Sequence, residues 1–258
     1  MFKNAFERLA LPLWVSLTYL FLYIPIIVLI VFSFNSIAFP YHWESFSLHW
    51  YHELFAAADL WKAAYNSLFV GLSTVFLSLV ISLFFVMWNA SRKDNFLLAF
   101  FYPNLVVPEI ILAVGLLSFF IFFNVPLTLG TLIVGHTLLG LGYAIPILHE
   151  SFSSIDERLV EASLDLGATS TQTFFKIIIP ILTPSLIAAG LLVFILSLDD
   201  FLIAFFCAGS GSQTLSLYIF AMIRTGVSPE VNALATLMIV VSSLLVFLFC
   251  SVRVREQE

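Results

Sequence analysis

Two adjacent carboxylates, Asp199 and Asp200, lie within the stretch LIAAGLLVFILSLDDFLIAFF, which otherwise carries no charge. A third acidic residue, Glu109, follows Pro108 in the apolar stretch NLVVPEIILAV. An ionisable group inside a lipid bilayer is costly, and it usually faces a transport pathway or a charged partner. If these stretches cross a membrane, their acidic residues are therefore suited to binding a cation on its way through.

The composition indicates a membrane protein. Of the 258 residues, 61% are hydrophobic and only 10% are charged, whereas soluble domains contain about 25% charged residues. Such a chain cannot cover itself with a water-compatible surface. Its two cysteines, Cys207 and Cys250, are too few and too far apart for a disulfide framework or a metal site, and we expect no bound metal.

Long apolar stretches predict an all-α, polytopic membrane protein. A helix needs about 18–25 apolar residues to cross the hydrocarbon core, and six stretches reach this length. They lie near residues 11–34, 64–89, 96–123, 127–148, 181–206 and 231–251. These six transmembrane helices account for most of the chain, so we expect a single transmembrane domain over residues 1–258.

The basic residues predict the orientation of these helices. All but two of the ten lie on one side of the membrane, which the positive-inside rule identifies as the cytoplasmic side. They are Lys3, Arg8, Arg92, Lys93, Arg158, Lys176, Arg253 and Arg255. Both termini are therefore expected in the cytoplasm. At a rise of about 1.5 Å per residue, Glu109 and Asp199 then lie at similar depth, in the outer half of the bilayer.

The two outer segments differ in character. Residues 35–62 are rich in aromatic rings, among them Trp50, and such rings favour the headgroup layer. Within this segment, SLHWYHELF predicts a short interfacial helix capped by Ser47. Its histidines lack a nearby cysteine or carboxylate arrangement, so a wet surface is favoured over a metal site. Residues 213–232 are apolar but contain Gly226 and Pro229, which favours a segment that re-enters the membrane or lies on it.

The inner segment 149–180 predicts two short helices. Ser154 followed by Glu157 is typical of a capping box at the start of the first helix, and Gly167 is suited to ending it in the left-handed conformation. Ser170 or Thr171 then caps a second helix. One face of the first helix is apolar, formed by Ile155, Leu159, Ala162 and Leu166. This hairpin either simply joins two spans or serves as a docking element for a cytoplasmic partner.

The same segment carries a resemblance to a known family. Glu161-Ala162-Ser163, then Gly167, then the sequence IIIP ending at Pro180 is similar to the EAA loop of binding-protein-dependent ABC importer permeases, whose pattern is E-A-A-x3-G-x9-I-x-L-P. Only Ser163 and Ile179 depart from this pattern, and both replacements are small. The stretches YIPIIVLIVFSFNS, SLDDF and GVSPEVNALAT further resemble the spermidine/putrescine permeases.

The resemblance implies a subunit of a larger importer with the type I ABC importer permease fold. It implies a second, homologous permease subunit, a cytoplasmic ATPase dimer and an extracytoplasmic binding protein, all at the inner membrane of a bacterium. The chain has no G-x4-G-K-[ST] sequence for ATP phosphates. We therefore expect a transport subunit that is not an enzyme and binds no cofactor, with ATP and Mg on the partner ATPase.

The resemblance also assigns roles to residues. It implies a polyamine path, used by alternating access, along Trp50, Glu109, Ser197, Asp199 and Asp200. It implies that loop 150–180 couples to the ATPase through Glu161, Ala162, Ser163, Gly167 and Pro180. Neighbouring helix positions point about 100° apart, so Asp199 and Asp200 are expected to do different jobs, one facing the path and the other the second permease.

Other interpretations remain open at this point. One of the two aspartates could instead pair with Lys62 or Arg224, the two outer basic residues, and His136 is interpreted as a packing contact between helices. The substrate could be another cation, such as a basic amino acid, and the sequence does not rank spermidine against putrescine. A proton-coupled secondary transporter would be a different class of protein. Vanadate separates the two classes, because it should stop only an ATP-driven transporter. A purely structural membrane subunit is disfavoured by the three buried acids.

Overall fold

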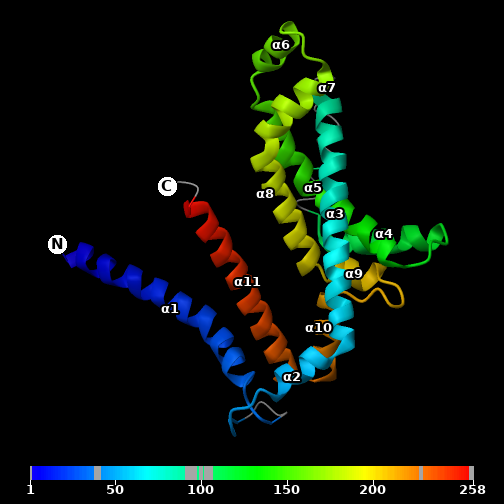
Figure 1. Ribbon diagram of the computed structural model, residues 1–258. Helices are drawn as coiled ribbons and strands as arrows, with labels where there is room; N and C mark the ends of the chain where they lie inside the picture. Colours follow the sequence, from blue (N-terminus) through cyan, green and yellow to red (C-terminus); the bar gives the residue numbers. More distant parts are fainter. Residues whose placement is uncertain are drawn as a thin grey trace. The chain divides into compact units, whose positions relative to one another are not determined.

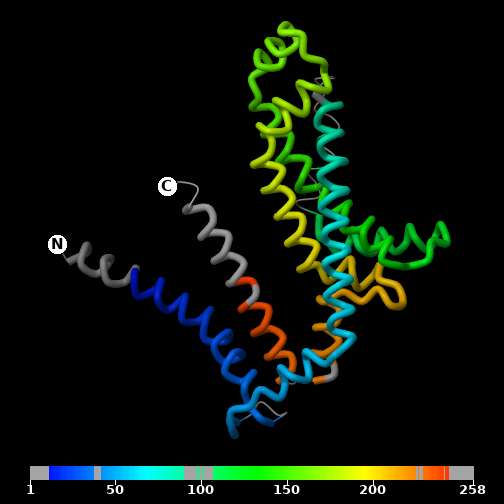
Figure 2. Tube along the Cα trace, in the orientation of Figure 1, coloured from blue at the N-terminus to red at the C-terminus, as the bar shows by residue number. Residues whose placement is uncertain are grey.

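The computed structural model describes residues 2–37, 42–90, 98, 101, 107–226 and 229–255. These residues are almost entirely helical, and the β-structure among them is one isolated antiparallel bridge between Asn35 and Phe46. The chain divides into two compact units (Figures 1 and 2), one of Met1–Leu60 with Ile219–Glu258 and one of Trp61–Tyr218. The all-α prediction is confirmed, whereas the prediction of a single domain stays a prediction.

The first unit contains α1 (Phe2–Phe32), α2 (His49–Ala56), the end of α10 (Leu215–Thr225) and α11 (Pro229–Arg255). Helix α11 contacts both α1 and α2. Helix α2 is the short helix predicted from SLHWYHELF, and the Ser47 hydroxyl accepts a hydrogen bond from the backbone N–H of His49 at 3.1 Å, as expected for a residue that caps its start.

The second unit is built around α5 (Leu129–Ser153) and α8 (Ile179–Asp199), which pack side by side. Helix α4 (Glu109–Phe122) packs against α5 and the short helix α9 (Leu202–Cys207). Helix α3 (Ala58–Ala90) runs beside them (Figure 1), and its Ser78 hydroxyl donates to the carbonyl of Thr137 in α5 at 3.5 Å. The core where α4, α5 and α9 meet includes Ala113, Leu116, Phe120, Leu132, Leu139, Ile203, Ala204 and Cys207.

Four helical segments are long and apolar enough to cross a membrane. Among the described residues these are Pro12–Phe32, Ala58–Asn89, Leu129–Ser153 and Ser170–Asp199. They coincide with the first, second and fourth predicted spans and overlap the fifth, which was predicted to start and end later. The third and sixth correspond to the shorter apolar helices Glu109–Phe122 and Pro229–Val240. The count of six spans and the position of both termini stay predictions.

Two of the predicted spans are not continuous helices. The third, predicted over 96–123, has no helix at Val107 and Pro108, and α4 begins at Glu109. Most of its earlier part lies outside the described residues. The fifth, predicted over 181–206, stops at Asp199. Asp200 has an extended backbone (φ −60°, ψ 125°), and α9 begins two residues later.

The residues that cap the two helices of the inner segment differ from those predicted. Ser154 ends α5, and Asp156 begins α6 (Glu157–Asp165) because its carboxylate accepts from the N–H of Arg158 at 3.0 Å. Thr169, rather than Ser170 or Thr171, begins α7 (Ser170–Thr173) in a capping box with Gln172. Asp156 directly precedes α6 and is closer than Ser154 to the first free amides of that helix. The prediction that Ser154 caps this helix is therefore wrong.

Gly167 takes the role predicted for it. Its φ is +87°, in the left-handed region, and the N–H of Ala168 bonds to the carbonyl of Ser163 at 3.0 Å. The N–H of Gly167 bonds to the carbonyl of Leu164 at 2.9 Å. This pattern closes α6 as a Schellman motif. The chain then turns into α7, which continues through the π-helical turn Phe174–Ile178 into α8.

Side chains of α3 hold the backbone of the loop after α9 in place. The amide of Asn66 in α3 donates to the carbonyls of Gly211 at 3.3 Å and Gln213 at 2.9 Å, and Ser67 accepts from the N–H of Leu215 at 2.8 Å. At Gly209 the loop approaches the Leu127 carbonyl so closely that a side-chain carbon would overlap it. Neither backbone can move away easily.

We expect Gly209→Ala to destabilise the protein by about 1–3 kcal/mol, the usual cost of overpacking. The measurement is the thermal unfolding midpoint of the purified protein in detergent. Gly115→Ala is the matched control, since an added carbon there meets no atom within 4 Å and alanine favours a helix interior by about 0.5–1 kcal/mol. Equal midpoints for the two variants would contradict the packing described for the loop.

Candidate cation-binding site in the second unit

The three acidic residues singled out from the sequence line one cavity. Its volume is about 270 Å³, and its walls come from the start of α4, from α5, and from the junction of α8 and α9. The lining residues are Val107, Glu109, Leu112, Leu139, Tyr143, Leu196, Asp199, Asp200, Phe201 and Leu202. Apolar side chains and the three carboxyl groups share its walls, and acidic groups gathered in such a cavity attract cations.

The interruptions in two predicted spans place these carboxyl groups together. Pro108 has an extended backbone (ψ 127°) and Glu109 is the first residue of α4. Asp199 is the last residue of α8, and Asp200 occupies the break before α9. Continuous helices would have placed the acids along helix flanks. The breaks place them at helix ends, where the backbone turns away and leaves space.

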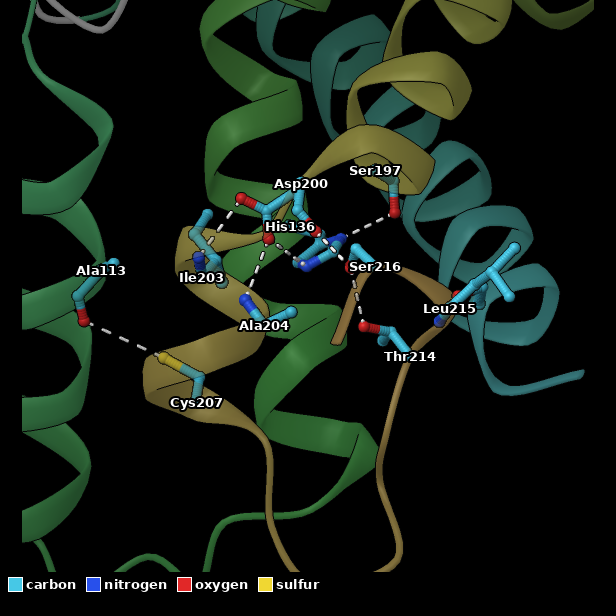
Figure 3. A network of polar contacts seen from close by, with 11 residues as sticks. Ala113, His136, Ser197, Asp200, Ile203, Ala204, Cys207, Thr214, Leu215 and Ser216 are labelled. Carbon is cyan, nitrogen blue, oxygen red and sulfur yellow. Dashed lines mark hydrogen bonds and ion pairs between the residues drawn. The ribbon is translucent and has the colours of Figure 1, made fainter. Parts of the chain in front are cut away.

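Asp200 is a structural carboxylate as well as a cavity residue. Its side chain is buried, with 6% of the residue exposed. One carboxylate oxygen accepts from the N–H of Ile203 at 3.2 Å and the other from that of Ala204 at 2.9 Å (Figure 3). The Ser216 hydroxyl donates to the Asp200 carbonyl at 2.7 Å. Asp200 therefore caps the first turn of α9 and satisfies amides that lipid could not.

His136 of α5 is a neighbour that sequence reasoning missed. Its Nε2 lies 3.1 Å from the Oδ2 atom of Asp200, and its Nδ1 lies 2.7 Å from the hydroxyl oxygen of Ser197 (Figure 3). The sequence suggested a packing contact only, although a histidine inside a span that also faces acids is a signal of function. Among the described residues of the second unit, the ion-pair partner of Asp200 is His136 and not Lys62.

Asp199 and Glu109 differ from Asp200 in their surroundings. Asp199 is exposed and Glu109 is partly exposed, and both face the cavity. Glu109 lines the same cavity as Asp199 and Asp200, so the three carboxyl groups share one space. Like charges brought this close favour a bound cation or a shared proton between them. Tyr143 and Phe201 add aromatic rings to the wall, and such rings attract cations.

The other two predicted path residues lie elsewhere. Ser197 is buried and bonds to His136, and it is not among the residues that line the cavity. Trp50 belongs to the first unit, where its indole N–H donates to the carbonyl of Asn35 at 2.7 Å. The structure thus brings together Glu109, Asp199 and Asp200, with Ser197 behind Asp200, and it leaves the role of Trp50 as a prediction.

The predicted coupling residues lie on and around α6. Ser163 is buried and its hydroxyl lies 2.6 Å from that of Thr173, which ties α6 to α7. Glu161 and Ala162 are exposed, Gly167 forms the turn after α6, and Pro180 lies in the first turn of α8. Glu161 also lines a second cavity of about 490 Å³, together with Phe152, Ser153, Ile155, Glu157, Val160 and Ile178.

The apolar face predicted for α6 is largely unpaired within the chain. Leu159 is 50% exposed and Leu166 is 89% exposed, as is typical of a surface that another protein covers. A solvated connection between two spans has no need of such side chains. The geometry therefore favours docking over a simple link.

Comparison with known proteins gives a consistent result. Residues 75–254 match the family of binding-protein-dependent transport system inner membrane components. The spermidine/putrescine transport system permease protein PotC of Haemophilus influenzae is 35% identical over 236 residues, covering 89% of this chain and 91% of that protein. The Escherichia coli PotC protein is 36% identical over 231 residues, covering 88% of both chains.

A third relative and a solved structure extend the comparison. The putrescine transport system permease protein PotI of Escherichia coli is 33% identical over 233 residues, covering 86% of this chain and 83% of that protein. The fold is similar to a chain of a bacterial ABC transporter that imports the acidic polysaccharide alginate, with a TM-score of 0.73, 15% identity and 96% of both chains covered. At this identity the structural match speaks for the fold alone.

The different surroundings of the two aspartates predict different effects on stability. We expect Asp200→Ala to lower stability by about 1–3 kcal/mol, because it leaves the amides of α9 and the ring of His136 without an acceptor. Asp199→Ala, which removes an exposed carboxylate, should leave stability unchanged. Thermal unfolding of the purified variants in detergent measures both, and a larger loss for Asp199→Ala would show that the assignment of the capping role is wrong.

Proposed function

This chain belongs to the family of binding-protein-dependent transport system inner membrane components, and we propose that it is the permease subunit of an ATP-driven importer that carries linear polyamines such as spermidine and putrescine into the cytoplasm. The observation that carries the proposal is the cavity that Glu109, Asp199 and Asp200 line beside aromatic rings. The named relatives, which transport spermidine and putrescine, support the same substrate class.

The chemistry of the cavity fits a polyamine. Two carboxylates that repel each other provide two places for ammonium groups, and the apolar and aromatic wall suits the methylene chain between them. The volume of about 270 Å³ is near the lower limit of about 300 Å³ for small-molecule sites, and a thin, unbranched chain is the kind of ligand that such a site accepts. Partial exposure of both acids leaves the cation weakly enough held to be released.

The partners follow from what the chain lacks and what it exposes. It carries no sequence for binding ATP phosphates, so a cytoplasmic ATPase dimer binds ATP and magnesium and docks on the apolar side of α6, where Leu159 and Leu166 are exposed. A second, homologous permease completes the path, and a binding protein delivers the polyamine from outside. The two permeases then expose the cavity alternately to the two sides.

One helix links docking to the cavity. From Ser170 to Asp199 the chain forms a single helical segment of 30 residues, which is about 45 Å long at 1.5 Å per residue. Its first turn bonds to α6 through Thr173 and Ser163, and its last residue is Asp199 in the cavity wall. A movement that the ATPase imposes on α6 is therefore transmitted along a stiff element to one of the two carboxylates that hold the substrate.

We expect Glu109→Gln and Asp199→Asn each to lower polyamine uptake by about tenfold or more, because a hydrogen bond to a charged group contributes about 1.5–3 kcal/mol. The measurement is uptake of radiolabelled spermidine and putrescine by vesicles that contain the complete importer. Glu44→Gln, which alters an exposed acid of the outer segment, is the matched control.

Two further measurements separate the competing interpretations. Vanadate should abolish uptake if the transporter is ATP-driven, and uptake that persists in vanadate but stops with the proton gradient would identify a secondary transporter. Competition by arginine or lysine that exceeds competition by putrescine would make a basic amino acid the substrate. Unchanged uptake in both carboxylate variants would remove the cavity from the path.

The coupling role of α6 generates a separate prediction. Gly167→Val forces a branched side chain into a left-handed conformation, at a cost of about 1–2 kcal/mol, and should displace α6. We expect Gly167→Val and Glu161→Ala to reduce both uptake and co-purification of the ATPase. Ser154→Ala is the control, since Asp156 rather than Ser154 caps α6. Full uptake and intact ATPase binding in both variants would show that α6 does not couple the two subunits.

A further inference from the structure

We propose that His136 is the positioning residue of this path. It holds Asp200 and Ser197 in place, so that Asp200 serves the break between α8 and α9 while Asp199 and Glu109 receive the substrate cation. This inference rests on the proposed function, because it assigns the three acids different tasks in the same cation path. The observation that carries it is the bridge from Ser197 through the imidazole to Asp200 (Figure 3).

The hydrogen-bonding capacity of Asp200 is largely taken up by the protein. Its two oxygens accept from the amides of Ile203 and Ala204, and His136 Nε2 is 3.1 Å from Oδ2. Nε2 has no hydrogen-bond partner of regular geometry among the described residues, so the 3.1 Å contact with Asp200 is its polar interaction. The Ser197 hydroxyl can donate to Nδ1 or accept from it, so it satisfies the ring in either the neutral or the charged form. Asp200 therefore needs no hydrogen-bond donor from a substrate.

Burial makes this arrangement obligatory. The side chains of His136 and Asp200 are 1% and 0% exposed, and a buried carboxylate without partners is strongly unfavourable. Within the described part of the second unit, the basic side chain that lies against the Asp200 carboxylate is that of His136.

His136 contacts the break between α8 and α9 from a different helix, α5. The residue lies on α5, whereas Ser197 lies on the last turns of α8 and Asp200 lies in the break itself. Contacts to both hold the end of α8 against α5. The direction in which the adjacent Asp199 leaves the helix is set by the same turn. Removing the imidazole therefore alters the placement of the carboxylate that meets the substrate without removing that carboxylate.

The test compares two polar replacements of His136 in the complete importer. The terminal nitrogen of glutamine extends about as far as Nε2 and can donate to Asp200, whereas that of asparagine extends about as far as Nδ1 and can contact only Ser197. We expect His136→Gln to retain most polyamine uptake and His136→Asn to lose it by about tenfold, which corresponds to about 1.4 kcal/mol. Equal uptake by the two variants, or higher uptake by His136→Asn, would overturn the proposal.

A double-mutant cycle shows whether His136 acts through Asp200. His136→Leu is combined with Asp200→Asn and, separately, with Asp199→Asn, and initial uptake rates are measured on complexes that retain all subunits. If His136 acts through Asp200, its loss should have little further effect in the Asp200→Asn background but its full effect with Asp199→Asn. Additive losses in both backgrounds would overturn the proposal. Should His136→Leu not assemble, the comparison of Gln with Asn decides.

Two controls keep the outcomes distinct. Thr137→Val changes the next residue of α5, whose buried hydroxyl has no hydrogen-bond partner among the described residues, and it should leave uptake unchanged. A wild-type complex that takes up no polyamine would overturn the proposed function, and with it this inference. Normal wild-type uptake together with an additive cycle would overturn the inference about His136 alone.

Discussion

The carboxylate of Asp200 allows a membrane helix to stop and start again. A break in a helix at membrane depth frees amides that lipid cannot satisfy, and such breaks occur only where protein or water supplies partners. Here the supply comes from the residue in the break, which accepts from the first free amides of α9. His136 of α5 lies against the same carboxylate, with its Nε2 atom 3.1 Å from Oδ2. The cavity, the end of α8 and the placement of Asp199 all depend on this group of contacts.

The break also separates two demands that one acidic residue could not meet. A carboxylate that supports the backbone has to be buried and fully bonded, because an unmet charge in the interior is costly. A carboxylate that passes a cation along has to be accessible and incompletely bonded, so that the ligand can arrive and leave. Asp200 is buried whereas its neighbour Asp199 is exposed. The adjacent pair in SLDDF thus combines one buried and one exposed carboxylate.

One continuous helical element connects the inner hairpin with the cavity. The π-helical turn Phe174–Ile178 joins α7 to α8 without an interruption of the helix, so the inner hairpin and the cavity share one long element. The hairpin end is tied to α6 by buried hydroxyl groups, and the cavity end is tied to α5 through Ser197 and His136.

Local patterns in the sequence determined much about this protein. Apolar length predicted the helices, the spacing from Glu161 to Pro180 indicated the coupling loop, and Asp199, Asp200 and Glu109 stood out because charge is rare in such segments. The left-handed backbone conformation of Gly167 was also predicted from the local sequence, because glycine is suited to ending a helix in this way. Only the tertiary structure decided where the spans break and which side chains meet Asp200. Nothing in the local pattern of LIAAGLLVFILSLDDF interrupts a helix, whereas in the fold the carboxylate in the break accepts from the amides of α9 and contacts a histidine 64 residues earlier in the chain.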